Sequence, residues 1–241
     1  MKISICMATH NGEKYLCKQI NSILTQISAG DEIIVVDDAS TDSCVKILDD
    51  FSDLRIKVFK NHTNLGPIIS FETAIKKSSG EIIFLSDQDD IWMPTKVQSF
   101  LEVFNSCPDI TLALSDAQII DNEDRTTASS YFKQRGKFRN GLLTNVIKNK
   151  YHGCTMAFRR EILAVALPFP RDIPMHDLWI GIVNSIYGKT FYIDTPLIQH
   201  RRHNNNTGYG YKSSGNLLSI LKWRLTLAKN IVQLILKKAK V

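Results

Sequence analysis

The chain has 241 residues, of which 44% are hydrophobic and 22% are charged, and this composition is ordinary for a folded globular protein and excludes a largely disordered one. No run of 18 apolar residues occurs, so the sequence predicts no membrane-spanning helix. The 30 Lys and Arg residues outnumber the 24 Asp and Glu residues, which gives a net charge of +6, and much of the excess lies near the C-terminal end. This distribution favours an anionic partner there, either phosphate or a lipid surface.

The five cysteines are scattered and form no C-x-x-C pair. Several of them fall inside apolar patterns, which is typical of free thiols in a reducing compartment, so we expect a cytoplasmic protein. We interpret His10, His62 and His152 as structural.

The first ninety residues alternate apolar runs with helical stripes. The runs are rich in β-branched residues and have the length of buried strands, whereas the stripes repeat every three or four residues, as on one face of a helix. Short polar turns separate them, so the pattern predicts βαβ units and a mostly parallel sheet in an α/β domain. The expected strands are residues 3–8, 32–36, 56–59 and 82–85, and the stripes cover residues 16–27, 45–51 and 68–75.

An acidic cluster follows the fourth predicted strand. Asp87, Asp89 and Asp90 lie within four positions, directly before Ile91. Because clustered carboxylates repel one another, they predict a hard divalent ion with oxygen ligands, Mg²⁺ or Mn²⁺. Such an ion usually completes its shell with waters and substrate phosphates, so we expect a diphosphate ligand. The alternative is an acidic surface loop with no ligand.

Two further polar clusters, residues 9–11 and 37–38, also follow predicted strands. Ligands bind beyond the carboxyl ends of the strands in parallel sheets, so the three clusters should meet in one crevice. The chain has no G-x-G-x-x-G after its first strand and no G-x-x-x-x-G-K-[ST], which disfavours dinucleotide oxidoreductases and P-loop nucleotide triphosphatases. A phosphatase with a nucleophilic aspartate is disfavoured because the acidic cluster follows the fourth strand rather than the first.

Several motifs resemble a known family in their order and spacing. Residues 3–12, 34–42, 64–66 and 87–92 read ISICMATHNG, IVVDDASTD, NLG and DQDDIW, and they resemble the family 2 glycosyltransferases of the GT-A fold. The bacterial branch that makes surface polysaccharides, including rhamnosyltransferases, is matched further along by residues 151–161, 175–179 and 200–208. Within the last of these motifs, His200 stands where a tyrosine is usual.

The resemblance implies one GT-A-like, Rossmann-type α/β domain over residues 1–208. Residues 1–116 would bind a nucleotide sugar, residues 117–208 would shape the acceptor site, and residues 209–241 are not matched. The implied reaction is a metal-dependent transfer with inversion at the anomeric carbon, from a dTDP- or UDP-sugar to a lipid-linked or polysaccharide acceptor in O-antigen or capsule synthesis. Rhamnose is the first candidate sugar, and glucose, galactose or an N-acetylhexosamine stay open. The competing class is a non-catalytic subunit that binds a nucleotide sugar, and we expect no nucleic-acid partner.

The resemblance places five residues of the first half at the nucleotide. Thr9 and Asp38 would hold the base, and a carboxylate can indeed accept the imide N–H of uracil or thymine. Asn11 and Glu13 would add polar contacts, and Asp87 would lie near the ribose and the metal ion.

The metal and diphosphate ligands are implied in the same way. Asp89 would be the principal ligand of Mg²⁺ or Mn²⁺, with Asp87 and His203 as further ligands. Arg201, Arg202 and His203 would stabilise the leaving diphosphate, because cationic donors offset developing phosphate charge. The alternative for the arginines is a solvated basic loop.

On the acceptor side, the resemblance implies Gly153, Trp179 and a general base, Asp177. One carboxylate suffices in an inverting transfer, because the acceptor hydroxyl loses its proton as it attacks the anomeric carbon. The alternative is that Asp177 only caps the following helix. A tryptophan such as Trp179 can stack on a sugar, although a tryptophan at a helix start also fits a core.

From Asn216 onward, apolar residues recur at helical spacing, lysines share the other face, and no acidic residue occurs. The pattern predicts a basic amphipathic helix. It could attach the protein to the anionic inner face of the cell membrane, where a lipid-linked acceptor would be found. It could instead dock on the domain or form a homodimer contact.

Overall fold

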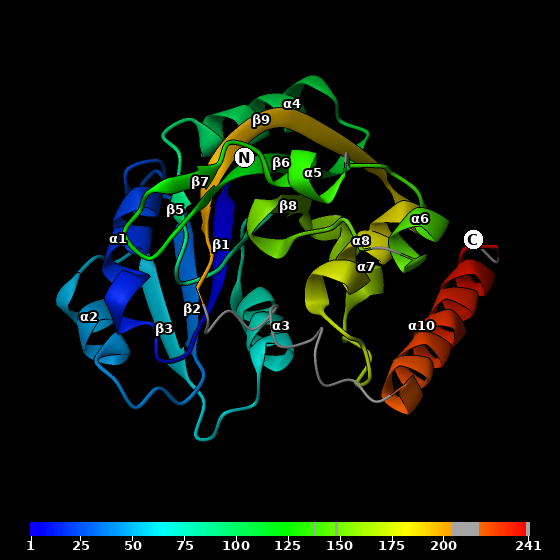
Figure 1. The fold of residues 1–241 in the computed structure, drawn as a ribbon, viewed down its shortest axis with the longest axis horizontal. Helices are drawn as coiled ribbons and strands as arrows, with labels where there is room; N and C mark the ends of the chain where they lie inside the picture. The colour runs from blue at the N-terminus through cyan, green and yellow to red at the C-terminus, as the bar shows by residue number, and fades with distance from the viewer. Residues whose placement is uncertain (137, 148, 204–216, 240–241) are drawn as a thin grey trace.

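The computed structural model describes residues 1–136, 138–147, 149–203 and 217–239. In this part of the chain, nine strands form one sheet against which the helices pack (Figure 1). The strands are β1 (Ile3–Thr9), β2 (Glu32–Asp37), β3 (Ile56–Lys60), β4 (Ile82–Ser86), β5 (Ile91–Trp92), β6 (Ile110–Ile120), β7 (Thr126–Ala128), β8 (Met156–Arg159) and β9 (Lys189–Arg201). The helices are α1 (Glu13–Leu24), α2 (Cys44–Asp50), α3 (Pro67–Lys77), α4 (Lys96–Ser106), α5 (Tyr131–Arg135), α6 (Leu142–Ile147), α7 (Leu163–Ala166), α8 (His176–Tyr187) and α10 (Leu217–Lys238), with 3₁₀ turns η1 (Gly153–Thr155) and η2 (Arg160–Ile162).

The strand order is β3-β2-β1-β4-β8-β6-β9-β5, and β7 pairs with β6. Neighbours among β1 to β4 run parallel, as the alternating pattern predicts. In the second half, β8 lies antiparallel between β4 and β6, while β9 runs parallel to β6 and antiparallel to β5. The expected α/β class with a GT-A-like arrangement is confirmed, and antiparallel pairs connect its two halves.

The parallel strands form the centre of the core. Every residue of β2 and β4 is buried, which explains why both read as continuous apolar runs rather than as alternating patterns. The stripe of α1 supplies Leu16, Ile20 and Ile23, all buried, at the spacing of one helix face.

The C-terminal helix α10 is present as expected and packs beside α8 at the edge of the molecule (Figure 1). Leu227, Ile231 and Leu234 are buried on one face, and the hydroxyl of Tyr187 donates a 2.7 Å hydrogen bond to the Leu234 carbonyl. The helix therefore docks on the domain, as one of the two interpretations of the sequence holds. Within the described residues, no helix has the length and apolar character needed to cross a bilayer.

Gly80 provides a test of how β4 enters the sheet. A Cβ at this position would lie 2.5 Å from the carbonyl carbon of Ile3 and 2.5 Å from the amide nitrogen of Ser4, both in the backbone of β1. Because β1 is central, we expect Gly80→Ala to lower the free energy of unfolding by about 1–3 kcal/mol, as overpacking of a core does. Urea denaturation measures the change.

Gly30→Ala is the matched control, because a Cβ there would have no atom within 4 Å. We expect its unfolding free energy to stay within about 0.5 kcal/mol of the wild type. Equal effects of the two substitutions would contradict the close approach of Gly80 to β1.

Candidate active site

The carboxyl ends of β1, β2 and β4 lie side by side at one edge of the sheet. In the sheet register, Thr9 pairs with Asp37, and Met7 pairs with Ser86 at the end of β4. The backbone N–H of Asp38 also donates a 2.8 Å hydrogen bond to the Thr9 carbonyl. The polar clusters that follow these strands therefore meet at one place, as the sequence predicts.

Gln88 joins the acidic loop to the end of β1. Its Oε1 accepts hydrogen bonds from the Thr9 hydroxyl at 2.5 Å and from the His10 backbone N–H at 2.8 Å, and its Nε2 donates to the His10 carbonyl at 3.0 Å. Gly12 leaves room for this side chain, because a Cβ there would lie 2.3 Å from Gln88 Oε1. Gln88 was not predicted as a site residue. A side-chain amide among three carboxylates could have indicated a residue that binds neighbouring backbone groups rather than a cation.

Asp38 organises the turn that precedes α3. Its buried carboxylate accepts hydrogen bonds from Asn61 Nδ2 at 2.7 Å and from the backbone N–H groups of Leu65 and Gly66 at 2.9 and 2.8 Å. A carboxylate offers about four acceptor positions, so one more donor, such as a base N–H, can be accommodated.

Asn11 and Glu13 both hold the loop after β2. Asn11 Oδ1 accepts a 2.9 Å hydrogen bond from the Thr41 backbone N–H, and Glu13 Oε2 accepts one of 2.9 Å from the Ser43 backbone N–H. These contacts fix the loop beside the crevice, and the expected contact of either side chain with a nucleotide stays a prediction.

Asp89 and His203 lie together, as expected of two ligands of one metal ion. His203 Nε2 is 2.7 Å from Asp89 Oδ2, and the ring of Tyr15 stacks on His203 with centroids 5.4 Å apart. The sequence analysis missed Tyr15, because an aromatic residue on a helix carries no signal of a distant loop.

The other two carboxylates of the loop, Asp87 and Asp90, have opposite pKa shifts. Burial, followed by the charges of Asp90 and Asp89, raises the pKa of Asp87 to about 8. Burial also disfavours the Asp90 carboxylate, but His200 at 3.0 Å and the Arg201 backbone N–H at 2.9 Å outweigh it and hold its pKa at about 2. Hard oxygen donors that repel one another fit Mg²⁺ or Mn²⁺, so Asp89 and Asp87 could hold either ion.

Lys96 is a third residue, after Gln88 and Tyr15, to which the sequence pattern gave no role. Its side chain is fully buried, its Nζ donates a 2.6 Å hydrogen bond to the Cys154 carbonyl, and it lies 4.4 Å from the centroid of the Trp92 ring. Burial lowers its pKa to about 8, against the attraction of Asp90 and Asp87.

Arg201 differs from the expectation of an arginine that faces a diphosphate. Its side chain is fully buried, Nε donates to the Asp89 carbonyl at 2.8 Å, Nη1 donates to the Asp121 carbonyl at 2.7 Å, and Nη2 lies 2.6 Å from Asp124 Oδ1. We correct its role to that of a residue that fixes the acidic loop. Arg202 is only half-buried, with its guanidinium 5.6 Å from the centroid of the Tyr131 ring.

Asp177 and Gly153 are in direct contact, as their shared assignment to the acceptor side requires. The Gly153 backbone N–H donates to Asp177 Oδ2 at 3.1 Å, and the Leu178 backbone N–H donates to Oδ1 at 2.6 Å. Burial raises the pKa of Asp177 to about 6, although these hydrogen bonds oppose the shift. The geometry thus combines a helix-end contact with a carboxyl group that titrates near neutral pH.

Trp179 fits the second interpretation of its position, that of a core residue at a helix start. Its ring is buried, and Nε1 donates a 2.9 Å hydrogen bond to the carbonyl of Ala166 in α7. The indole therefore belongs to the core, and we withdraw it from the acceptor site.

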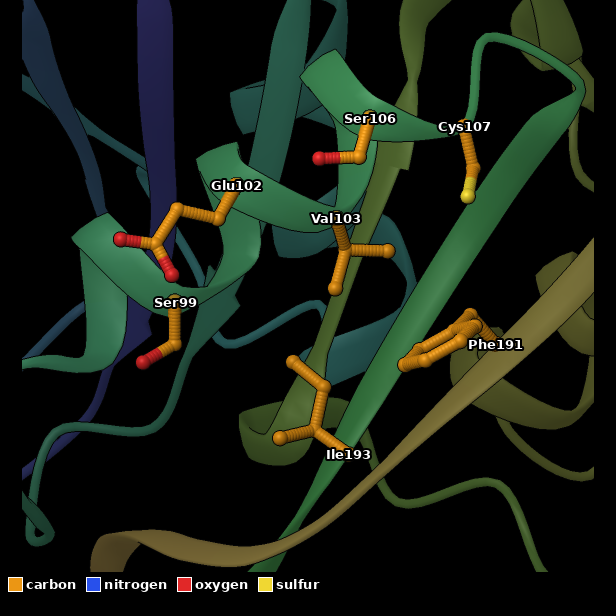
Figure 2. Close-up of a pocket in the computed structure, with 7 residues that line it drawn as sticks. All are labelled: Ser99, Glu102, Val103, Ser106, Cys107, Phe191 and Ile193. Atoms are coloured by element: carbon orange, nitrogen blue, oxygen red, sulfur yellow. The ribbon is translucent and has the colours of Figure 1, made fainter.

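A separate shallow groove of about 360 Å³ lies between α4 and β9 (Figure 2). Figure 2 shows Phe191 and Ile193 of β9 facing Val103 of α4 across it. None of its lining residues belongs to the predicted site: Ser99, Glu102, Val103, Ser106, Cys107, Phe191 and Ile193.

Known proteins resemble this chain over most of its length. It is 30% identical over 189 residues to Escherichia coli WfgD, a UDP-Glc:alpha-D-GlcNAc-diphosphoundecaprenol beta-1,3-glucosyltransferase, and the match covers 76% of this chain and 70% of WfgD. It is 26% identical over 227 residues to the dTDP-rhamnosyl transferase RfbG of Shigella flexneri, with coverage of 83% and 72%. A crystal structure of Staphylococcus aureus TarS in complex with UDP-GlcNAc shares the fold with a TM-score of 0.71 at 20% identity, and the match covers 90% of this chain and 62% of that one.

The chain spans about two thirds of the length of the curated relatives that it matches, 66% in one case, and about 60% of the solved chains. The family model described as Glycosyl transferase family 2 matches residues 4–165, which is more than half of the chain. Together with the relative that is 30% identical, this match shows that the chain belongs to glycosyltransferase family 2.

Proposed function

We propose that this protein transfers a sugar from a nucleotide diphosphate donor to a lipid-linked acceptor of a bacterial cell-surface glycan. The observation that carries the proposal is the meeting of the ends of β1, β2 and β4 at an acidic loop, with Gly153 next to both Leu85 of β4 and Asp177. The names of WfgD and RfbG support a nucleotide sugar donor, and the name of WfgD supports a lipid-linked acceptor.

The donor would lie along the strand ends. Thr9 and Asp38 lie at the ends of β1 and β2. There, an N–H of the nucleobase could donate one further hydrogen bond to the carboxylate of Asp38. Asp89 and Asp87, with His203, would hold Mg²⁺ or Mn²⁺, which neutralises the charge of the departing diphosphate when bound. Rhamnose from dTDP-rhamnose is our first candidate for the transferred sugar, and glucose from UDP-glucose is the second.

Asp177 would act as the general base. One of its carboxylate oxygens takes the proton of the acceptor hydroxyl while that oxygen bonds to the anomeric carbon. The bond from the anomeric carbon to the diphosphate breaks on the opposite face, the nucleoside diphosphate leaves, and the configuration inverts. A pKa of about 6 leaves Asp177 ionised at neutral pH and still basic enough to accept a proton.

The nucleotide site is tested by calorimetric titration with UDP, dTDP and GDP, each with and without Mn²⁺. We expect one nucleotide to bind, and we expect Mn²⁺ to increase its affinity at least tenfold in the wild type. Asp89→Asn should abolish that increase, because an amide is a poor ligand for a hard cation. Gln98→Asn, on the exposed side of α4, is the control and should behave as the wild type. Failure of all three nucleotides with folded protein would refute the site.

Asp177→Asn tests the base. Inverting transfer is measured with dTDP-rhamnose or UDP-glucose and a synthetic lipid diphosphate that carries α-D-GlcNAc. We expect kcat to fall about 10²–10⁴-fold, as is typical when a general base is lost. The wild-type rate should rise as the pH increases through about 6, because Asp177 accepts a proton only when it is ionised. In Asp177→Asn, the rate should no longer rise in this pH range.

The same variant separates catalysis from helix capping, because asparagine keeps an oxygen for the Leu178 backbone N–H. The folded-state pKa of Asp177 lies above the unfolded one, so ionisation costs stability as the pH rises between about 4 and 6. Asparagine cannot ionise, and the free energy of unfolding at pH 8 should therefore not fall. Near-native turnover in Asp177→Asn would show that another group is the base.

A second apolar face of α10 supports contact with an anionic membrane surface. Leu225, Val232 and Leu236 are spaced seven and four residues apart, so they lie on one face, and they are 64, 55 and 58% exposed. This face lies opposite the docked one, and the chain has no acidic residue after Asp194. Exposed basic side chains, including Lys229, flank the stripe, as expected of a helix that lies on anionic lipid.

Flotation with vesicles tests this face. We expect the wild type to bind vesicles of phosphatidylglycerol and phosphatidylcholine but not phosphatidylcholine alone. Val232→Glu with Leu236→Glu should lower binding at least about tenfold, because two apolar side chains no longer bury their surface. Thr226→Glu with Gln233→Glu, which adds the same charge beside the stripe, should retain most of the binding. Equal loss of vesicle binding in both double variants would exclude an apolar contact. If light scattering shows a dimer and only Val232→Glu with Leu236→Glu dissociates it, the exposed face contacts a second copy of the chain instead.

A further inference from the structure

A buried group of sulfur, nitrogen and oxygen donors lies behind the acidic loop. His152 and Cys154 come from the segment around η1, His200 comes from β9, and Asp90 comes from the loop after β4. One potential ligand atom from each of His152, Cys154 and His200 lies within 4.8 Å of the others, and Asp90 is equally close to Cys154. Cys154 and Asp90 are fully buried. Asp87, which we assign to the proposed Mg²⁺ or Mn²⁺ site, lies within the same distance of Cys154 and Asp90, so the two sites adjoin each other.

Two pairs of potential ligand atoms in this group lie close to the spacing expected around one small ion. Cys154 Sγ lies 3.8 Å from His200 Nδ1, which lies 3.0 Å from Asp90 Oδ1. Ligand atoms at bond lengths of roughly 2.0–2.3 Å from a tetrahedral Zn²⁺ are roughly 3.3–3.6 Å from one another. One observed distance is longer than this range and the other is shorter. Shifts of the side-chain atoms by a few tenths of an ångström would bring both distances into the range.

Within the part of the chain that the structure describes, His152 has a ring nitrogen without a hydrogen-bond partner. Its Nε2 is buried and makes no hydrogen bond. The ring is held in place by Tyr131, which stacks on it with centroids 4.7 Å apart and planes 4° apart, and by the edge of His200 at 4.5 Å. An oriented, buried and unpartnered nitrogen costs free energy unless something binds it, so it points to a ligand.

The carboxylate of the group has the supporting contacts that ligands usually have. Asp90 Oδ1 accepts a hydrogen bond from the Arg201 backbone N–H, which fixes the carboxylate, and within the described residues its buried Oδ2 has no hydrogen-bond partner. Asp89, in the same loop, contacts His203 instead, and neither residue belongs to the Cys–His group.

We propose that His152, Cys154, His200 and Asp90 bind a borderline divalent cation such as Zn²⁺, at a second cation site beside the one proposed for Mg²⁺ or Mn²⁺. Thiolate and imidazole ligands favour Zn²⁺ and Co²⁺ over the hard ions that carboxylates alone prefer. On binding, the Cys154 thiol gives up its proton to solvent and the imidazole ligand atoms bind as free bases. The ion would join η1, β9 and the acidic loop, three segments that frame the crevice.

Titration of metal-free protein with Co²⁺ tests the site, because cobalt bound to a thiolate has a charge-transfer band in the near ultraviolet. We expect one equivalent of Co²⁺ to produce this band together with the visible bands of a tetrahedral ion, and one equivalent of Zn²⁺ to remove them. Cys154→Ser should lose the thiolate band, and Cys6→Ser, the same change at another fully buried cysteine, should keep it. A band that is absent from the wild type, or that persists in Cys154→Ser, would overturn the proposal.

His152→Phe provides a second variant that keeps a ring to stack on Tyr131 but has no nitrogen. We expect it to weaken Zn²⁺ binding at least tenfold in competition with a chromophoric chelator. Asp89→Asn should leave the thiolate–cobalt band unchanged, and loss of the band in this variant would contradict the proposal of a second cation site that is independent of Asp89. Nucleotide titration with Mn²⁺ in Cys154→Ser should match the wild type. The experiments therefore distinguish a failure of the proposed nucleotide site from a failure of the proposed Cys–His cation site.

Discussion

Mutual repulsion among three carboxylates in one buried loop is the constraint on which the rest of the structure depends. Asp87, Asp89 and Asp90 follow β4 directly, and they cannot all be ionised in isolation at this depth. The protein resolves the conflict unequally, because burial and its neighbours raise the pKa of Asp87 to about 8, while His200 and the Arg201 backbone hold that of Asp90 at about 2. Asp90 is therefore held in its ionised form, whereas Asp87 would lose its proton when a cation binds.

The compensating groups come from distant parts of the chain. Strand β9 ends beside the loop and brings His200 and Arg201, with His203 just beyond it. Lys96 approaches from α4 and is buried beneath the same charges. The second half of the chain thus supplies His200, Arg201 and His203 to the surroundings of the loop, and α4 of the first half supplies Lys96.

Several residues that resemble family motifs serve first to build the frame of the site. The Asp38 carboxylate accepts three hydrogen bonds from the segment before α3, and Asn11 and Glu13 hold the loop after β2. Such contacts orient the crevice before any donor arrives, which lowers the ordering cost of binding. A motif residue can therefore matter for binding without having a free side chain.

The sequence by itself determined the alternation of strands and helices, the α/β class and the meeting of residues 9–11, 37–38 and 87–90, because periodicity and the rule for parallel strand ends are local properties. It also placed Asp89 with His203 through the order of the motifs. Only the tertiary structure decided that Arg201 is buried against Asp89 of the acidic loop and against Asp121 and Asp124, that Trp179 lies in the core, and that Gln88 fills the space left by Gly12. These outcomes depend on which side chains pack together in the folded chain, and for Arg201 and Gln88 the partners lie more than seventy residues away, so no local pattern contains that information.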